Sequence, residues 1–175
     1  GYVYIRNSNT QGSADIEFFF GNPGDVPISG DWDGDGDDTV SIYRPSQGRF
    51  FIINELGEDG GGLGAADYDF YFGNVGDVPF VGDFDGDDID EIGLYRQSTG
   101  YVYFRNTLDT GVAHFEFYYG NPGDVILAGD WDGDGDDTVA VYRPSTGRLY
   151  LNFDNAPGAA DYDVYVGTVI AASRA

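Results

Sequence analysis

The sequence GDWDGDGDDTV occupies residues 30–40, recurs unchanged at residues 129–139, and has an edited copy, GDFDGDDIDEI, at residues 82–92. Counted from its first aspartate, each copy has Asp at positions 1, 3 and 5, and glycines lie among them. Alternate carboxylates of a short loop can point at one centre, and glycine permits the tight backbone turn that this requires. Three acidic clusters of one design therefore indicate three metal sites rather than one acidic surface.

Each acidic stretch lies between two short runs with strand character. In the first copy these runs cover residues 26–29 and 40–44, which predicts that the stretch connects a β-hairpin. The helix–loop–helix calcium hand also has Asp at positions 1, 3 and 5, but it needs flanking helices and a Glu at position 12. Position 12 is Ile42, Leu94 or Val141 here, which excludes the hand.

The acidic stretches belong to a longer repeat. Gly1, Gly48, Gly100 and Gly147 open similar segments at spacings of 47, 52 and 47 residues, a period typical of β-propeller blades. The first unit contains four strand-like runs separated by turn residues, and no stretch shows a sustained helical period. We therefore expect an all-β propeller of four-stranded blades, 47–52 residues each, in one repeat domain over residues 1–175. Its units are residues 1–47, 48–99, 100–146 and, in part, 147–175.

The composition limits the class of partner and the location. A hydrophobic content of 41% is enough for a packed interior, while 31 acids against 8 bases give a net charge of -23. This charge argues against nucleic acid and anionic membranes as partners, and no apolar run is long enough for membrane insertion. Because the chain has no Cys and therefore no disulfide bonds, bound calcium is the expected cross-link that stabilises the fold. Modest-affinity calcium loops stay filled in millimolar calcium, which favours a secreted or cell-surface protein.

With acidic loops on hairpins at this period, the chain resembles the FG-GAP or VCBS type of calcium-binding propeller repeat. That repeat is known from integrin α-subunit heads and many secreted bacterial proteins. Its pattern is Asp-x-[Asp/Asn]-x-Asp-Gly-x-x-Asp, with ligands at positions 1, 3, 5, 7 (through the carbonyl) and 9. The resemblance implies about three Ca²⁺ ions, held by Asp31, Asp33, Asp35, Asp37 and Thr39, by Asp83, Asp85, Asp87, Ile89 and Glu91, and by Asp130, Asp132, Asp134, Asp136 and Thr138.

Two positions depart from the family pattern. Position 9 is Thr in the two outer loops, so Asp38 or Asp137 at position 8 is an alternative ligand, with Asp90 as its counterpart in the middle loop. Position 6 of the middle loop is Asp88 where the family has Gly and where a positive φ is needed. Aspartate tolerates that conformation better than most residues, so we expect a filled but distorted site.

The ligand chemistry favours calcium over other ions. A cage of carboxylates and carbonyls suits a large ion with flexible coordination, whereas magnesium keeps several waters. The single histidine and the absence of cysteine exclude a zinc site.

The register of the resembling family leaves open how the blades close. It implies complete blades over residues 26–72, 78–119 and 125–166, two further strands within residues 2–20, and a lone strand at residues 169–172. The favoured hypothesis is a four-bladed ring whose last blade is shared between the chain termini. The alternative is pairing with copies of the same chain through the terminal strands.

No group of residues indicates catalysis. The only histidine, His114, lacks a partnered nucleophile, and calcium would keep the loop acids ionised. Arg44, Arg96 and Arg143 follow Tyr in each unit and are predicted to pair with acids such as Asp25, Asp77 and Asp124.

We therefore expect a non-enzymatic calcium-binding structural or adhesion module. Self-assembly through its incomplete terminal blades is an open alternative to closure within one chain. The alternative is a carbohydrate-binding, lectin-like propeller, because exposed aromatic residues near Asp and Asn suit glycans. The candidate aromatic residues are Tyr2, Tyr4, Phe19, Tyr101, Tyr103 and Tyr118.

Overall fold

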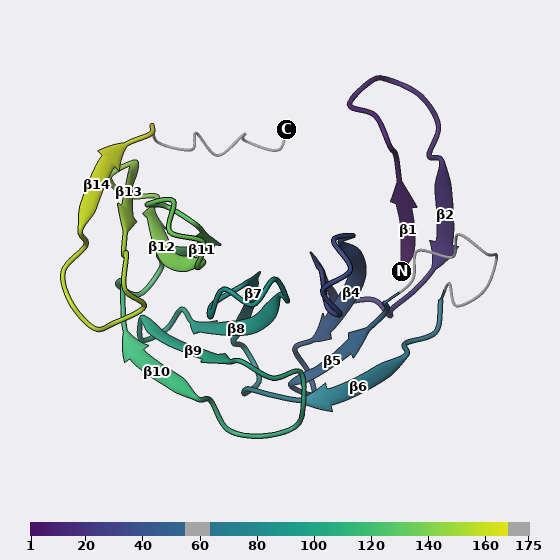
Figure 1. The fold of residues 1–175 in the computed structure, drawn as a ribbon, viewed down its shortest axis with the longest axis horizontal. Coiled ribbons are helices and arrows are strands. Elements are labelled where there is room, and N and C mark those ends of the chain that lie inside the picture. The colour runs from purple at the N-terminus through teal and green to yellow at the C-terminus, as the bar shows by residue number, and fades with distance from the viewer. Residues whose placement is uncertain (55–63, 168–175) are drawn as a thin grey trace.

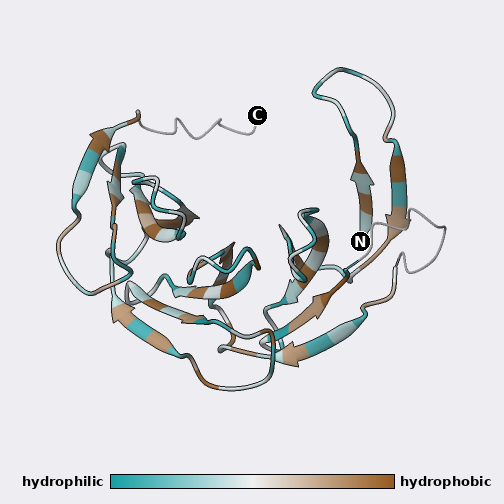
Figure 2. Cartoon of the chain, viewed as in Figure 1, coloured by the Kyte–Doolittle hydropathy of each residue, from teal (hydrophilic) through white to brown (hydrophobic). Residues whose placement is uncertain are grey.

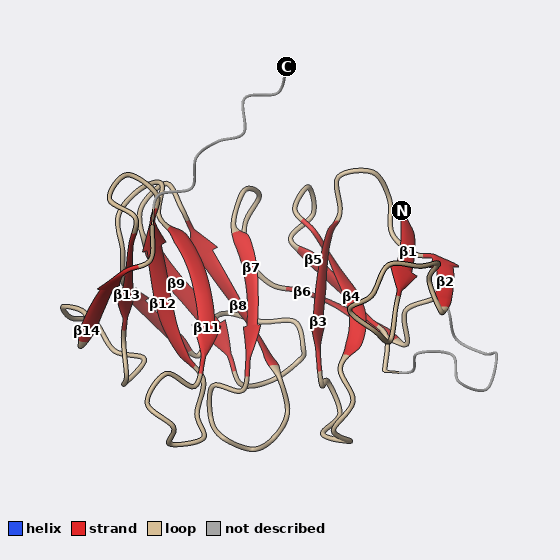
Figure 3. Ribbon diagram, turned by 90° about the horizontal axis from the view of Figure 1, so that it is seen from above, coloured by secondary structure: helices blue, strands red, loops and turns tan. Residues whose placement is uncertain are grey.

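The computed structural model describes residues 1–54 and 64–167, which form an all-β structure without helices in these ranges (Figure 3). None of the described residues therefore belongs to a helix with the length and hydropathy needed to cross a membrane. The strands are β1 (Tyr2–Ile5), β2 (Ile16–Phe19), β3 (Val26–Gly30), β4 (Thr39–Arg44), β5 (Arg49–Ile52), β6 (Tyr68–Tyr71), β7 (Val78–Gly82), β8 (Glu91–Arg96), β9 (Tyr101–Arg105), β10 (Phe115–Tyr118), β11 (Val125–Gly129), β12 (Thr138–Arg143), β13 (Arg148–Leu151) and β14 (Tyr162–Tyr165).

The strands form four antiparallel sheets in chain order. β3–β6, β7–β10 and β11–β14 are four-stranded meanders, and β1 pairs with β2 in a sheet of two strands. The three larger sheets fall within residues 26–72, 78–119 and 125–166, as the sequence predicts. The acidic stretches join β3 to β4, β7 to β8 and β11 to β12, so the prediction that each is a hairpin connection is confirmed.

The sheets follow one another around an open, U-shaped arc (Figure 1). β3 and β11 both contact β7, which places the first strands of the larger sheets on the inner side of the arc. The β1–β2 sheet and the β11–β14 sheet stand on opposite arms of the U. The described residues therefore form no closed four-bladed ring, and the strand predicted at residues 169–172 lies outside them.

The core lies between neighbouring sheets, because alternate residues of each strand face the adjacent sheet. Apolar and polar residues alternate along the strands (Figure 2), and in β5 Phe50 and Ile52 are buried while their neighbours are half-buried. Within the β3–β6 sheet, the ring of Phe50 stacks on those of its cross-strand neighbours Tyr43 and Phe70, with centroids 4.4 Å and 5.3 Å apart. Leu94 of β8 closes the same cluster. Buried contact of Leu94 with these rings thus packs the β7–β10 sheet against the β3–β6 sheet.

An Arg–Asp pair fixes the entry to each inner strand. Arg44 donates to both carboxylate oxygens of Asp25 at 2.9 and 2.8 Å, and the same two-point pairing joins Arg96 to Asp77 and Arg143 to Asp124. The hydrogen bond from Arg44 holds the pKa of Asp25 below its ordinary value. The predicted role of these arginines as structural partners is confirmed, since each one clamps the turn that leads into β3, β7 or β11.

Candidate metal centres

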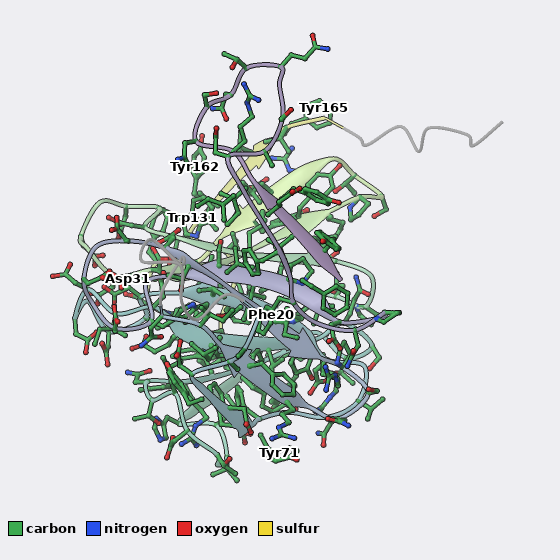
Figure 4. All side chains as sticks on the ribbon, turned by 90° about the vertical axis from the view of Figure 1, so that its right-hand side faces the viewer. Phe20, Asp31, Tyr71, Trp131, Tyr162 and Tyr165 are labelled. Carbon is green, nitrogen blue, oxygen red and sulfur yellow. The ribbon has the colours of Figure 1, made fainter. Side chains whose placement is uncertain are left out.

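The first acidic loop is organised around one carboxylate. Asp31 directly follows β3 and lies at one end of the strands, among other oxygen-rich side chains (Figure 4). Its side chain accepts the backbone N–H groups of Gly34 and Gly36 at 2.8 Å each, and that of Asp35 at 3.2 Å. The loop backbone therefore curls around the first aspartate, which is the shape that a cation-binding loop requires.

The other two loops repeat this arrangement. The Asp83 carboxylate accepts N–H groups from Gly86 and Asp88 at 2.7 and 2.9 Å, and the Asp130 carboxylate accepts that of Gly133 at 2.7 Å. Desolvation disfavours the charged form of Asp31, but the N–H groups outweigh it and lower the pKa of this carboxyl. The first aspartate of this loop is thus prepared to act as a permanently ionised ligand.

Each loop also gathers several acids around one point. Within each group, one ligand oxygen per acid lies within 4.8 Å of those of the others, close enough for a single ion to contact them all. Carboxylates this close repel one another unless a cation separates them. A hard divalent cation with oxygen ligands fits this donor set. The groups are Asp31, Asp33 and Asp35; Asp83, Asp85, Asp87 and Glu91; and Asp130, Asp132 and Asp134.

The middle group differs because it contains a fourth, buried carboxylate. Glu91 is 2% exposed, and its Oε2 accepts the N–H of Phe84 at 2.9 Å. Burial raises the pKa of Glu91 to about 8, and the nearby charges of Asp85 and Asp87 act in the same direction. At neutral pH a bound cation would have to displace a proton from Glu91, in exchange for a fourth anionic ligand.

The threonines at position 9 of the outer loops are tied to strand ends. The Thr39 hydroxyl donates to the carbonyl oxygen of Ile53, and the Thr138 hydroxyl donates to that of Asn152 at 2.6 Å. Both side chains are buried. The two hydroxyls thereby attach the acidic hairpin to the residue that directly follows β5 or β13. This role was not predicted from the sequence.

Position 8 joins neighbouring loops. The N–H of Asp90 donates to the Asp31 carbonyl at 2.7 Å, and the N–H of Asp31 donates to Asp90 Oδ2 at 2.8 Å. One loop later, the N–H of Asp137 donates to the Asp83 carbonyl at 2.6 Å. None of the position 8 acids belongs to a carboxylate group among the described residues. The structure therefore places Asp90 and Asp137 at the junctions between successive loops.

Asp38 is the exposed member of this set. Asp90 and Asp137 are half-buried against the preceding loop, whereas in the described part of the chain no loop precedes that of Asp38. Burial raises the pKa of Asp90, and repulsion from Asp38 and Asp137 adds to the effect. The sequence signal for this junction was present, since position 8 is Asp in all three loops while position 9 varies.

The backbone at positions 6 and 7 shapes each loop. Asp88 has a φ of 67°, and the equivalent Gly36 and Gly135 have φ of 92° and 105°, which confirms that position 6 needs a positive φ. At position 7 the backbone N–H, not a side chain, makes the contact within the loop. The N–H groups of Asp37, Ile89 and Asp136 donate to the carboxylates of Asp35, Asp87 and Asp134 at 3.0 to 3.1 Å.

His114 has a structural partner. Its Nδ1 accepts the N–H of Asn106 at 3.2 Å, at the position where the Asp15 carboxylate accepts the N–H of Asn7 at 2.8 Å. The imidazole therefore makes the same hydrogen bond to the loop backbone as the Asp15 carboxylate makes in the first unit.

No family model, curated protein or solved structure matches this chain. Its resemblance to FG-GAP or VCBS repeats therefore rests on the acidic loops, on their period and on their position in hairpins, and it stays a prediction.

Proposed function

We propose that the chain is a non-enzymatic, calcium-stabilised structural or adhesion module of a secreted or cell-surface protein, with propeller repeats of the FG-GAP or VCBS type. The observation that supports this most is the set of three carboxylate groups, each built around an aspartate that the loop backbone already encircles. Calcium fits these groups better than magnesium because a cage of carboxylate oxygens suits an ion with flexible coordination geometry, whereas magnesium keeps several of its waters.

The position 8 contacts indicate what calcium does for the fold. Asp31 is both the central ligand of the first loop and the hydrogen-bond partner of Asp90 in the second. An ion in one loop therefore orders the backbone against which the next loop rests. Calcium on this proposal stabilises the junctions between sheets, and it offsets part of the net charge of -23.

The carbohydrate-binding alternative gains no specific support from the described residues. Its candidate aromatic residues include Tyr103, which packs against the cluster of Phe50 and Phe70 in the preceding sheet. An aromatic residue at this repeat position therefore serves packing between sheets in at least one place.

Calcium titration of the purified protein tests the proposal. Isothermal calorimetry is expected to show three sites, and each filled site adds about 2.7 kcal/mol of stability when free calcium is a hundred times its Kd. Asp35→Asn should remove or weaken one site, while Glu116→Gln, an exposed acid outside the three groups, should leave all three. Magnesium at the same concentration serves as the ion control.

An unchanged melting temperature when excess chelator replaces calcium would contradict the proposal, as would equal responses to calcium and magnesium. If Asp35→Asn lowers neither the number of sites nor the affinity of one of them, the assignment of the first group is contradicted.

A further inference from the structure

The β11–β14 sheet carries a face that the other large sheets bury. We call it the β11–β14 end face and define it by Trp131, Leu149 and Val164, all of which are half-exposed. The equivalent residues of the β3–β6 sheet are Trp32, Phe50 and Phe70, and those of the β7–β10 sheet are Phe84, Val102 and Phe117. All six are buried, because the following sheet covers them. Among the described residues, no sheet follows β11–β14.

The opposite end of the arc carries the complementary face. Tyr2, Tyr4 and Phe19 of the β1–β2 sheet are 61%, 64% and 61% exposed. Their rings form one cluster, with centroids 5.5 Å apart for Tyr2 and Tyr4 and 6.0 Å apart for Tyr2 and Phe19. The repeat equivalent of Tyr4 is Tyr103, whose side chain packs against the core of the preceding sheet. Tyr4 thus lies on a face that meets the preceding sheet elsewhere in the molecule, whereas Phe19 is exposed like its repeat equivalents Tyr71 and Tyr118, at 48% and 49%.

A backbone contact at the outer edge points to the same pairing. The N–H of Tyr71 in β6 donates to Thr110 Oγ1 at 3.0 Å, and the N–H of Gly111 donates to the Tyr71 carbonyl at 3.4 Å, so the β9–β10 loop rests on the edge of the preceding sheet. Tyr165 is the repeat equivalent of Tyr71 and is 63% exposed, against 48% for Tyr71. Gln11 and Gly12, in the β1–β2 loop, are the equivalents of Thr110 and Gly111.

We propose that a second copy of this chain packs head to tail on the first, with the β1–β2 sheet of one copy on the β11–β14 end face of the other. The two surfaces match as successive sheets do, yet within one chain they stand on opposite arms of the U (Figure 1). A second copy is therefore the occupant that fits the end face. The contact is heterologous, so the assembly grows into a ring or an open chain. The proposal identifies a second copy as the partner of the structural module proposed above, and it rests on that proposed function.

The mass in solution is the first test. With calcium present, light scattering should give a mass of two or more chains of 19.0 kDa, which rises with concentration. Val164→Asp on the end face and Tyr4→Arg on the β1–β2 sheet should each restore the single-chain mass. Val75→Arg, at a 75% exposed position in the β6–β7 turn, should leave the assembly intact. A single-chain mass at every concentration would overturn the proposal, as would an equal effect of Val75→Arg.

Directed cross-linking is the second test. Because the chain has no native cysteine, only the introduced cysteines can form disulfides. Gln11→Cys and Tyr165→Cys in separate chains should form a disulfide-linked pair when mixed and oxidised, whereas neither variant alone should do so. In a double variant, cross-linking should produce a ladder of multiples. A fast-migrating single chain would instead show closure within one copy and overturn the proposal, and so would the absence of any cross-link.

Calcium titration of the same variants separates the two proposals. Three calcium sites in a protein that stays a single chain would leave the metal assignment standing and remove only the head-to-tail contact.

Discussion

The middle acidic loop and its two outer copies use one scaffold with different chemistry. The outer loops have three clustered carboxylates, glycine at position 6 and a buried threonine that is tied to a strand end. The middle loop has four carboxylates, but it holds Asp88 at positive φ and buries Glu91. Affinity in such loops follows ligand charge and backbone rigidity. In the middle loop, the additional ligand charge of Glu91 should raise calcium affinity. The backbone conformation of Asp88 and the proton on Glu91 should lower it, and substitutions at these residues separate the effects.

The largest effect is expected from Glu91→Gln, which removes the feature that distinguishes the middle site. The variant keeps the side-chain size but loses the fourth anionic ligand, so calcium affinity at this site should fall by roughly a hundredfold. Isothermal calorimetry should then show two sites of unchanged affinity and one much weaker site. If all three affinities are retained, Glu91 is not a ligand.

The pH dependence of the calcium-free protein should reflect the same residue. The pKa of Glu91 is about 8 in the folded protein against an ordinary value of 4.5, so the folded state holds an extra proton between these values. This contribution to stability is fully present below pH 4.5 and is lost as pH rises through about 8. The raised pKa values of Asp90 and Asp137 act in the same direction.

Thermal unfolding in chelator should therefore show stability that decreases from pH 5 to pH 8, and Glu91→Gln should reduce the decrease. Calcium binding at pH 7 should release close to one proton from this group, measurable by calorimetry in two buffers with different ionisation enthalpies. A proton release that is equal in the parent protein and in Glu91→Gln would rule out this explanation.

Asp90→Ala tests whether neighbouring loops are coupled. The variant removes the acceptor of the Asp31 N–H but no member of a carboxylate group, so the first site should weaken by about 1 to 2 kcal/mol. Calcium titration with Asp38→Ala as the matched control checks this, because Asp38 occupies the same loop position and is exposed. Equal effects of the two substitutions would show that general charge, and not the contact between loops, is responsible.

The smallest effect is expected from exchanging position 6 between loops. Asp88→Gly relieves a left-handed backbone conformation and should stabilise the protein by about 0.5 kcal/mol, because part of the relief is offset by the greater freedom of glycine in the unfolded chain. Gly36→Asp should destabilise it by a similar amount, since a Cβ there meets no atom within 4 Å and only the conformation changes. Chemical denaturation measures both, and opposite signs are required.

The features that sequence reasoning predicted correctly are local or repeated. The hairpin position of the acidic loops follows from alternating runs on each side of an Asp-Gly tract. The positive φ at Asp88 follows from glycine at the same position in the other copies. The pairing of Arg44 with Asp25 follows from the recurrence of both residues in every unit. Each of these needs only neighbouring residues or the comparison of repeats.

Predictions about how the units meet were incomplete. The contact of the Asp90 carboxylate with the N–H of Asp31, which lies 59 residues away in the chain, does not follow from spacing within one loop. The buried hydroxyls of Thr39 and Thr138 could not be placed either, because their carbonyl partners lie beyond the next turn. Such contacts depend on the approach of two hairpins, and spacing within one hairpin does not specify that approach.

The amino-acid sequence therefore specifies the all-β class, the three acidic hairpin loops and the repeat that places them, because strand alternation and turn chemistry act over a few residues. The tertiary structure adds the junctions between loops, the burial that raises the pKa of Glu91, and the open arc. These properties arise from burial and from the packing of one sheet on the next, and both depend on residues that only the folded chain brings together.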